Sequence, residues 1–116
     1  MRKVTRATWS QEQDRCMLCG KRGGDHPLTR LETHEIARGP HRKKALECPA
    51  AFLRVCGFCH GDKLGTITEQ LAVKKFHDPE CYDRVAVNHL RSRAPEAITE
   101  DEVDAALAQM NLQPLY

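Results

Sequence analysis

Four of the six cysteines form two Cys-x-x-Cys pairs, Cys16 with Cys19 and Cys56 with Cys59. Two residues between cysteines let one tight turn direct both thiolates at a single ion, and two such turns supply the four ligands of a structural zinc site. We therefore predict that these residues hold a structural Zn²⁺. The alternatives are buried free thiols and a redox dithiol, but a redox pair is expected on a thioredoxin-like βαβ unit, which this sequence lacks.

The spacing between the two pairs leaves room for a second site. Thirty-six residues separate Cys19 from Cys56, whereas a zinc ribbon uses roughly 15–20. This insert contains the alternating stretch "LTRLETHEI", which predicts a short strand over residues 28–36, and His60 directly follows the second pair. Because the insert begins and ends at one ion, we expect His34 to return to His60 on the side away from the zinc, with Glu35 and Arg38 nearby.

The pattern "C-x-x-C … L-E-T-H-E-I … L-R-V-C-x-x-C-H" over residues 16–63 resembles the HNH nuclease family, the zinc-stapled branch of the ββα-metal fold. The resemblance implies that the four paired cysteines bind structural zinc. It also implies that His34 and His60 bind a catalytic divalent metal, Mg²⁺, Mn²⁺, Ni²⁺ or Zn²⁺, and that Glu35 occupies the position of the general base. The implied function is a metal-dependent endonuclease that hydrolyses phosphodiester bonds in DNA.

This chemistry requires an activated water, a cation near the phosphate oxygens and positive charge around the backbone. Basic side chains next to the histidines are expected to contact DNA phosphates without reading sequence, with binding that weakens as salt rises. These predicted DNA contacts are Arg38, His41, Arg42, Lys43 and Lys44.

Three positions depart from the family pattern. Glu35 stands where the family most often has histidine, "CPAAF" has no asparagine before "LRVC", and Leu64 stands where a second helix histidine is common. These departures motivate an alternative, a non-catalytic four-cysteine zinc module that binds nucleic acid or a protein partner.

The rest of the chain predicts a helical support for this core. Residues 1–15 form a basic arm with a short helix anchored by Trp9, residues 16–65 the zinc core, and residues 66–116 helices packed on it. Helix starts are predicted at Thr66 or Thr68, at Asp78 before Pro79, and at Thr99 with Glu102. The expected fold is α+β, a small treble-clef or ββα-metal core followed by two or three C-terminal helices.

Composition and charge agree with a small metal-stabilised protein. The 116 residues suit one domain, and aromatic residues make up only 5% of them, so packing alone is a modest source of stability. Residues 1–65 carry a net charge of +6 and residues 66–116 one of −4, which makes the cysteine-rich half the one suited to DNA.

A phage or host protein is a further candidate partner. Without a secretory signal or membrane span, a cytoplasmic location is expected.

Overall fold

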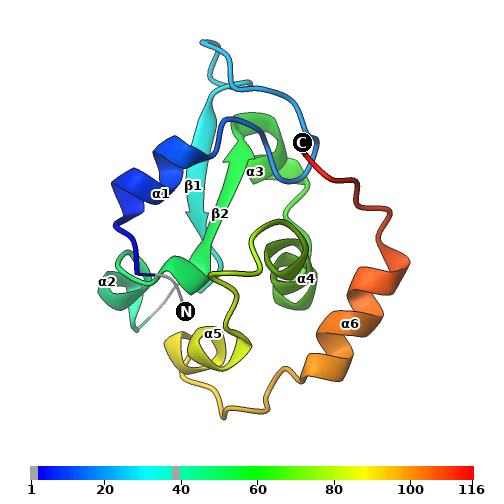
Figure 1. The fold of residues 1–116 in the computed structure, drawn as a ribbon. Coiled ribbons are helices and arrows are strands. Elements are labelled where there is room, and N and C mark those ends of the chain that lie inside the picture. The colour runs from blue at the N-terminus through cyan, green and yellow to red at the C-terminus, as the bar shows by residue number, and fades with distance from the viewer. Residues whose placement is uncertain (1–2, 38–39) are drawn as a thin grey trace.

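A two-stranded antiparallel sheet lies at the centre of the protein, with helices around it (Figure 1). The computed structural model describes residues 3–37 and 40–116, so the predicted DNA contact Arg38 lies outside the described residues. The described residues form an α+β protein with six α-helices. The elements in chain order are α1 Arg6–Glu12, β1 Leu31–Glu35, α2 Arg42–Ala45, the 3-10 helix η1 Pro49–Ala51, β2 Phe52–Cys56, α3 Gly57–Asp62, α4 Ile67–His77, α5 Arg84–Leu90 and α6 Glu100–Gln109.

The central hairpin confirms the predicted strand within residues 28–36. Strand β1 pairs with β2 so that His34 lies opposite Leu53 and Glu35 opposite Phe52. Successive side chains of a strand point to opposite faces, which places His34 and Glu35 on different sides of the sheet. Strand β2 forms the middle of the core, with Phe52, Leu53 and Val55 fully buried.

Helix α1 covers one face of the hairpin. Thr5 caps its N-terminus by accepting a hydrogen bond from the backbone amide of Thr8. Trp9 is fully buried, with its ring centroid 5.4 Å from that of Phe52. Trp9 therefore anchors α1 on the core, as the sequence predicts, and Val4 also packs against this core.

Helix α4 is joined to β2 through a buried lysine. The Lys74 ammonium is fully buried and donates to the Phe52 carbonyl at 2.8 Å and to the Asp78 carboxylate at 2.7 Å. The same Asp78 oxygen accepts from the Trp9 indole at 2.8 Å. Burial lowers the pKa of Lys74, and the nearby Asp78 opposes this effect. A buried charge needs such partners, so these bonds fix how α1, α4 and β2 pack.

The predicted helix start at Asp78 is wrong. Asp78 is instead the C-cap that follows α4, and α5 begins at Arg84 with Asp83 as its N-cap. The Asp-Pro dipeptide is a good local start signal, but the Asp78 carboxylate is engaged by Lys74 and Trp9. Tertiary contacts therefore decide the role of this residue.

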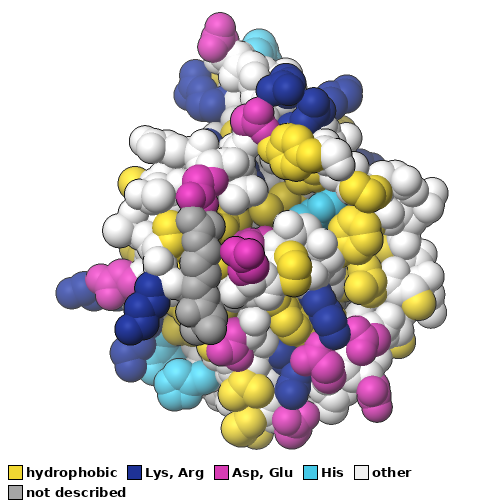
Figure 2. Space-filling view, in the orientation of Figure 1, with side chains coloured by type: hydrophobic (Ala, Val, Ile, Leu, Met, Phe, Trp, Pro, Cys, Tyr) yellow, Lys and Arg dark blue, Asp and Glu magenta, His cyan; other side chains and the backbone are white. Residues whose placement is uncertain are grey.

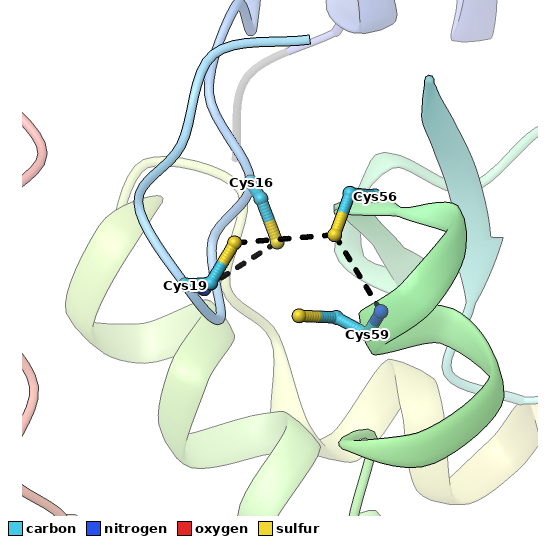
Figure 3. A group of neighbouring side chains, drawn as sticks. All are labelled: Cys16, Cys19, Cys56 and Cys59. Carbon is cyan, nitrogen blue, oxygen red and sulfur yellow. Dashed lines mark hydrogen bonds between the residues drawn. The ribbon is translucent and has the colours of Figure 1, made fainter. Parts of the chain in front are cut away.

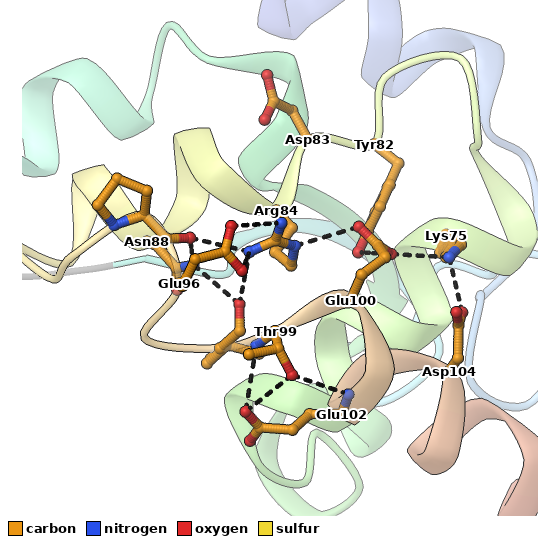
Figure 4. A network of polar contacts seen from close by, with 12 residues as sticks. Lys75, Tyr82, Asp83, Arg84, Asn88, Glu96, Thr99, Glu100, Glu102 and Asp104 are labelled. Atoms are coloured by element: carbon orange, nitrogen blue, oxygen red, sulfur yellow. Dashed lines mark hydrogen bonds and ion pairs between the residues drawn. The ribbon is translucent and has the colours of Figure 1, made fainter.

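Three helices follow the hairpin and α3, in agreement with the expected two or three. A network of ion pairs connects them (Figure 4). The Arg84 guanidinium binds Glu96 and Glu100 at 3.1 Å, and Lys75 of α4 binds Glu100 at 2.7 Å and Asp104 at 2.6 Å. Among the described residues, no helix has the length and apolar character needed to cross a membrane.

The C-terminal segment after α6 runs back toward the first cysteine pair, and the chain ends beside that loop (Figure 1). Leu112 and Leu115 pack against the core. The Tyr116 hydroxyl donates to Asp14, and the Arg15 guanidinium lies 5.6 Å from the Tyr116 ring centroid. Residues 112–116 therefore contact the segment that leads into Cys16.

Candidate functional site

The four paired cysteines converge on one point, where they could hold a metal ion such as zinc (Figure 3). All four sulfur atoms lie within 4.8 Å of one another, and the Sγ atoms of Cys19 and Cys56 are 3.9 Å apart. Tetrahedral Zn–S bonds of about 2.3 Å place sulfur atoms about 3.8 Å apart. The observed spacing and the all-thiol donor set therefore fit a structural zinc ion.

Both turns shape the backbone around the sulfur atoms. The amides of Leu18 and Cys19 donate to Cys16 Sγ at 3.4 Å, and the Cys59 amide donates to Cys56 Sγ at 3.5 Å. The first turn closes at Gly20, whose φ of +77° lies in the left-handed region that favours glycine. A side-chain carbon at Gly57 would lie 2.1 Å from the Pro27 carbonyl oxygen, so the second turn also requires glycine.

The electrostatics of the cluster favour an ion at its centre. Burial raises the pKa of both Cys59 and Cys19, and the nearby Cys16 thiol raises both further. Burial also opposes ionisation of Cys56, but hydrogen bonds from the Cys59 amide and the other thiols outweigh this effect and lower its pKa. Thiolates this close together repel one another, so a bound cation is what allows all four to ionise.

The structure brings His34 and His60 together. His34 belongs to β1 and His60 to α3, and their ring centroids are 5.0 Å apart in an edge-to-face arrangement with an interplanar angle of 64°. His34 is buried, with 7% of its surface exposed, and His60 is partly exposed. The hairpin thus returns His34 to the residue that follows the last cysteine, as the position of the insert between the two pairs predicts.

Gln70 of α4 fixes the tautomer of His34. The Gln70 side-chain nitrogen donates to the Gly65 carbonyl at 3.1 Å, so the Gln70 oxygen is the atom that faces His34 Nε2 at 2.9 Å. Because an amide oxygen only accepts, Nε2 of His34 carries the proton and Nδ1 carries the lone pair. Sequence reasoning missed Gln70, because it lies in a helix 36 positions from His34 and no local pattern indicates the contact.

Glu32 fixes the tautomer of His60 in the same way. Its carboxylate lies 2.6 Å from His60 Nδ1, so Nδ1 carries a proton and a neutral His60 has its lone pair on Nε2. Sequence reasoning also missed Glu32. A signal was present, since Glu32 lies two residues before His34 and therefore on the same face of β1.

Glu35 lies on the opposite face of the hairpin. Its side chain is only 7% exposed, and its carboxylate accepts from Arg6 of α1 at 2.7 Å. The same Arg6 nitrogen donates to the Thr33 carbonyl at 2.7 Å. The structure therefore places Glu35 at the junction between α1 and β1, and it does not join Glu35 to the histidine pair through any contact among the described residues.

The described basic candidates lie on or beside α2. Arg42, Lys43 and Lys44 are exposed on this four-residue helix, and His41 precedes it. His41 is partly buried and stacks on His89 of α5, with ring centroids 5.6 Å apart. The three exposed cations are accessible to a polyanion. Their contact with DNA stays a prediction.

The other two cysteines do not join the cluster. Cys81 is fully buried and Cys48 is partly buried, as is usual for free cysteines that act as small hydrophobic packing residues. Within residues 3–37 and 40–116, only the four paired cysteines bring three or more possible His, Cys, Asp or Glu ligand atoms close enough to hold one ion. Comparison with protein-family models, with curated proteins and with solved structures finds no match to this chain.

Proposed function

We propose that this protein is a metal-dependent endonuclease of the HNH type that hydrolyses phosphodiester bonds in DNA. The observation that carries the proposal is the meeting of His34 and His60, 5.0 Å apart, beside the four-cysteine cluster. In chain order the core is a β-hairpin followed by a helix, with the second cysteine pair at their junction. This order is the one expected of a zinc-bound treble-clef or ββα-metal core in residues 16–65.

The histidine pair would hold the catalytic metal. His34 Nδ1 and His60 Nε2 are the lone-pair nitrogens, and imidazole is a ligand that suits divalent metals. When bound, Mg²⁺, Mn²⁺, Ni²⁺ or Zn²⁺ polarises the phosphate and lowers the pKa of water. The two hydrogen bonds to Gln70 and Glu32 hold the rings before any metal binds, which limits the cost of ordering them.

Two carboxylates are candidates for positioning and proton transfer. Glu32 contacts His60 directly and its side chain is 43% exposed, so it can orient the imidazole and is accessible to water. Glu35, which the family resemblance places in the general-base position, would first have to release Arg6. We therefore assign Glu32 to orient His60 and regard Glu35 as a base only in a state where its ion pair with Arg6 has opened.

A plasmid-nicking assay tests the proposal. The zinc-loaded protein should convert supercoiled plasmid to nicked and linear forms when Mg²⁺, Mn²⁺ or Ni²⁺ is added. His34→Ala and His60→Ala should each reduce the rate about 100-fold or more, because losing a ligand costs at least as much as losing the outer group that orients it. His26→Ala is the matched control, since His26 lies in an exposed loop. Equal rates for wild type and both site variants across the three metals would exclude the nuclease.

One observation favours the alternative, a non-catalytic four-cysteine module that binds nucleic acid or a protein partner. Polar groups of the candidate centre already have partners within the chain: His34 contacts Gln70, and Glu35 contacts Arg6. Metal analysis separates the two functions. One tightly bound zinc per chain and no second exchangeable site for Mn²⁺ or Ni²⁺ supports the module, whereas a second site that His60→Ala removes supports the nuclease.

A further inference from the structure

A pocket of about 560 Å³ opens at the cysteine cluster, and Cys19, Cys56 and Cys59 form part of its lining. Its apolar walls come from Leu18, Leu28, Phe58, Met110 and Leu112. Leu28 and Phe58 are 54% and 51% exposed, so large apolar side chains border the opening of the pocket. Pockets of this volume and apolar character commonly bind small organic groups.

The charged residues that line this pocket are all basic. They are Lys21, Arg22 and Lys63, and no Asp or Glu lines it within the described chain. Arg22 contacts Asp14 at 2.8 Å and Lys63 contacts Asp62 at 3.5 Å, but all four side chains are at least half exposed. Exposed pairs of this kind are weak, so these cations can turn to a ligand. Figure 2 shows Lys and Arg side chains gathered around hydrophobic ones at the upper end of the molecule.

Phe58, which lines this pocket, and His60 of the histidine pair lie on the same helix, α3. Phe58 lies two residues before His60, and its amide donates to the Leu28 carbonyl at 3.0 Å. An exposed aromatic ring with cations around it is the combination that binds single-stranded nucleic acid, because bases stack on the ring and phosphates contact the cations. An anionic ligand with a flat apolar part matches both properties of the pocket.

We propose that this pocket binds an unpaired nucleobase of a single-stranded or locally opened DNA segment. The base stacks on Phe58 among the leucine and methionine side chains, and Lys21 and Lys63 contact the adjoining phosphates. The choice of DNA as the ligand rests on the proposed function. The pocket adds a substrate preference to that function: the protein binds unpaired DNA better than duplex DNA.

Binding of a fluorescein-labelled 12-nucleotide single strand, measured by anisotropy without added divalent metal, tests the pocket. Stacking on an aromatic ring is strong enough that its loss weakens binding about tenfold, so Phe58→Ala should raise the dissociation constant by that factor. Phe58→Trp should restore binding, since it keeps a stacking surface. Phe76→Ala is the matched control, because Phe76 is a partly exposed aromatic residue on α4 outside the pocket.

The salt dependence of binding tests whether Lys21 and Lys63 contact phosphates. Each phosphate contact to a single strand contributes about −0.7 to the slope of log affinity against log salt, so Lys21→Ala and Lys63→Ala should each make the slope shallower by about that amount. Wild-type affinity for the single strand should also exceed that for a duplex of the same sequence. Equal affinities of wild type and Phe58→Ala would overturn the proposal and point to an apolar protein side chain as the occupant.

The outcomes for the pocket and for the nuclease are separable. Phe58-dependent binding of the single strand without cleavage in any metal would refute the nuclease and leave the pocket supported. Metal-dependent cleavage that His34→Ala abolishes, together with single-strand affinity that Phe58→Ala does not change, would refute the pocket and leave the nuclease supported.

Discussion

The hydrogen bond between Glu32 and His60 determines which ring nitrogen of His60 is available to a metal. Outer carboxylates of this kind orient a histidine ligand and raise its basicity, and their loss typically costs about 10–100-fold in metal affinity or activity. For the proposed nuclease, we expect Glu32→Gln to raise the Mn²⁺ concentration needed for half-maximal cleavage by about tenfold or more. The rate at saturating Mn²⁺ should change less, and Glu32→Asp should recover part of the affinity.

The measurement is cleavage rate as a function of Mn²⁺ concentration. Glu47→Gln is the matched control, since Glu47 is exposed between α2 and η1. A purely structural role for Glu32 would lower thermal stability without moving the metal dependence. That result would contradict the assignment of Glu32 as the residue that orients His60.

His77 makes stability depend on pH. Burial lowers the pKa of His77, against a hydrogen bond to the Met17 backbone that raises it. The folded protein therefore binds fewer protons than the unfolded chain just below the ordinary histidine pKa of about 6.5, and folding stability falls as pH drops through this range. We expect His77→Gln to reduce the loss of stability between about pH 7.5 and about pH 5.5.

Urea unfolding of wild type and His77→Gln at both pH values measures this effect as the difference between their changes in unfolding free energy. His26→Gln is the control, because His26 is an exposed histidine in a loop. An equal pH dependence in wild type and His77→Gln would show that other groups control stability in this range.

Residue types and spacing predict the cysteine cluster and the meeting of His34 with His60, because the two cysteine pairs at the ends of the insert converge on one point. They cannot predict the partner of Glu35. Arg6 precedes Glu35 by 29 positions, and their contact depends on how α1 packs on the hairpin. The same limit applies to Gln70, which reaches His34 only after α4 packs on the sheet.

At the scale of elements, the N-terminus of α4 supports the histidine pair. Thr66 and Glu69 form a capping box, and Gln70 directly follows Glu69 in the first turns of the helix. Loss of a threonine cap typically costs about 1 kcal/mol. We expect Thr66→Ala to destabilise the protein by about that amount and to lower the melting temperature by about 4 °C.

Thermal unfolding followed by circular dichroism measures the change. Thr68→Ala is the matched control, since Thr68 lies in the same first turn but does not take part in the capping box. An equal loss of stability in the two variants would mean that the cap itself contributes little.

Capping signals predict helix starts well where only neighbouring residues decide them. Of the two predicted starts Thr66 and Thr68, Thr66 is the N-cap of α4, and the predicted capping box of Thr99 with Glu102 exists. Asp78 fails as a predicted start because its carboxylate binds Lys74 and Trp9, which come from two different helices. A local pattern therefore predicts an element boundary only when no distant side chain competes for the capping group.

At the scale of the whole molecule, one core connects the cysteine cluster to the C-terminal helices. Cys16, Cys56 and Cys59 belong to the same set of packed residues as Leu71 of α4 and Val103 of α6. Because structural zinc supplies folding free energy directly, its loss should destabilise both parts together. We expect Cys59→Ser to lower the melting temperature by more than about 10 °C, the shift that a loss of a few kcal/mol produces in a domain of this size. The α-helical and Trp9 signals should be lost in one transition.

Cys48→Ser is the control for this substitution, because Cys48 lies outside the cluster. Circular dichroism and tryptophan fluorescence follow the helices and Trp9, and metal analysis reports the bound zinc. Loss of zinc with an unchanged melting temperature would contradict the structural role of the cluster.

For the proposed function, the uneven charge of the chain predicts where duplex DNA would contact the protein. The positive half, residues 1–65, includes α2 with its three exposed cations, whereas the half with net charge −4 includes Arg91 and Arg93. Helix α2 lies near the end of the hairpin opposite α3 and the cysteine cluster (Figure 1). DNA bound along the hairpin could therefore contact α2 as well as the histidine pair.

Each phosphate contact to duplex DNA contributes about −0.9 to the slope of log affinity against log salt. Replacing Arg42, Lys43 and Lys44 together by Gln should therefore weaken duplex binding and make that slope shallower by up to about 2.7. Replacing Arg91 and Arg93 by Gln should leave the slope close to that of wild type, because these residues lie in the acidic half. Changes in proportion to the number of cations removed, three against two, would mean that net charge, and not the position of α2, controls DNA binding.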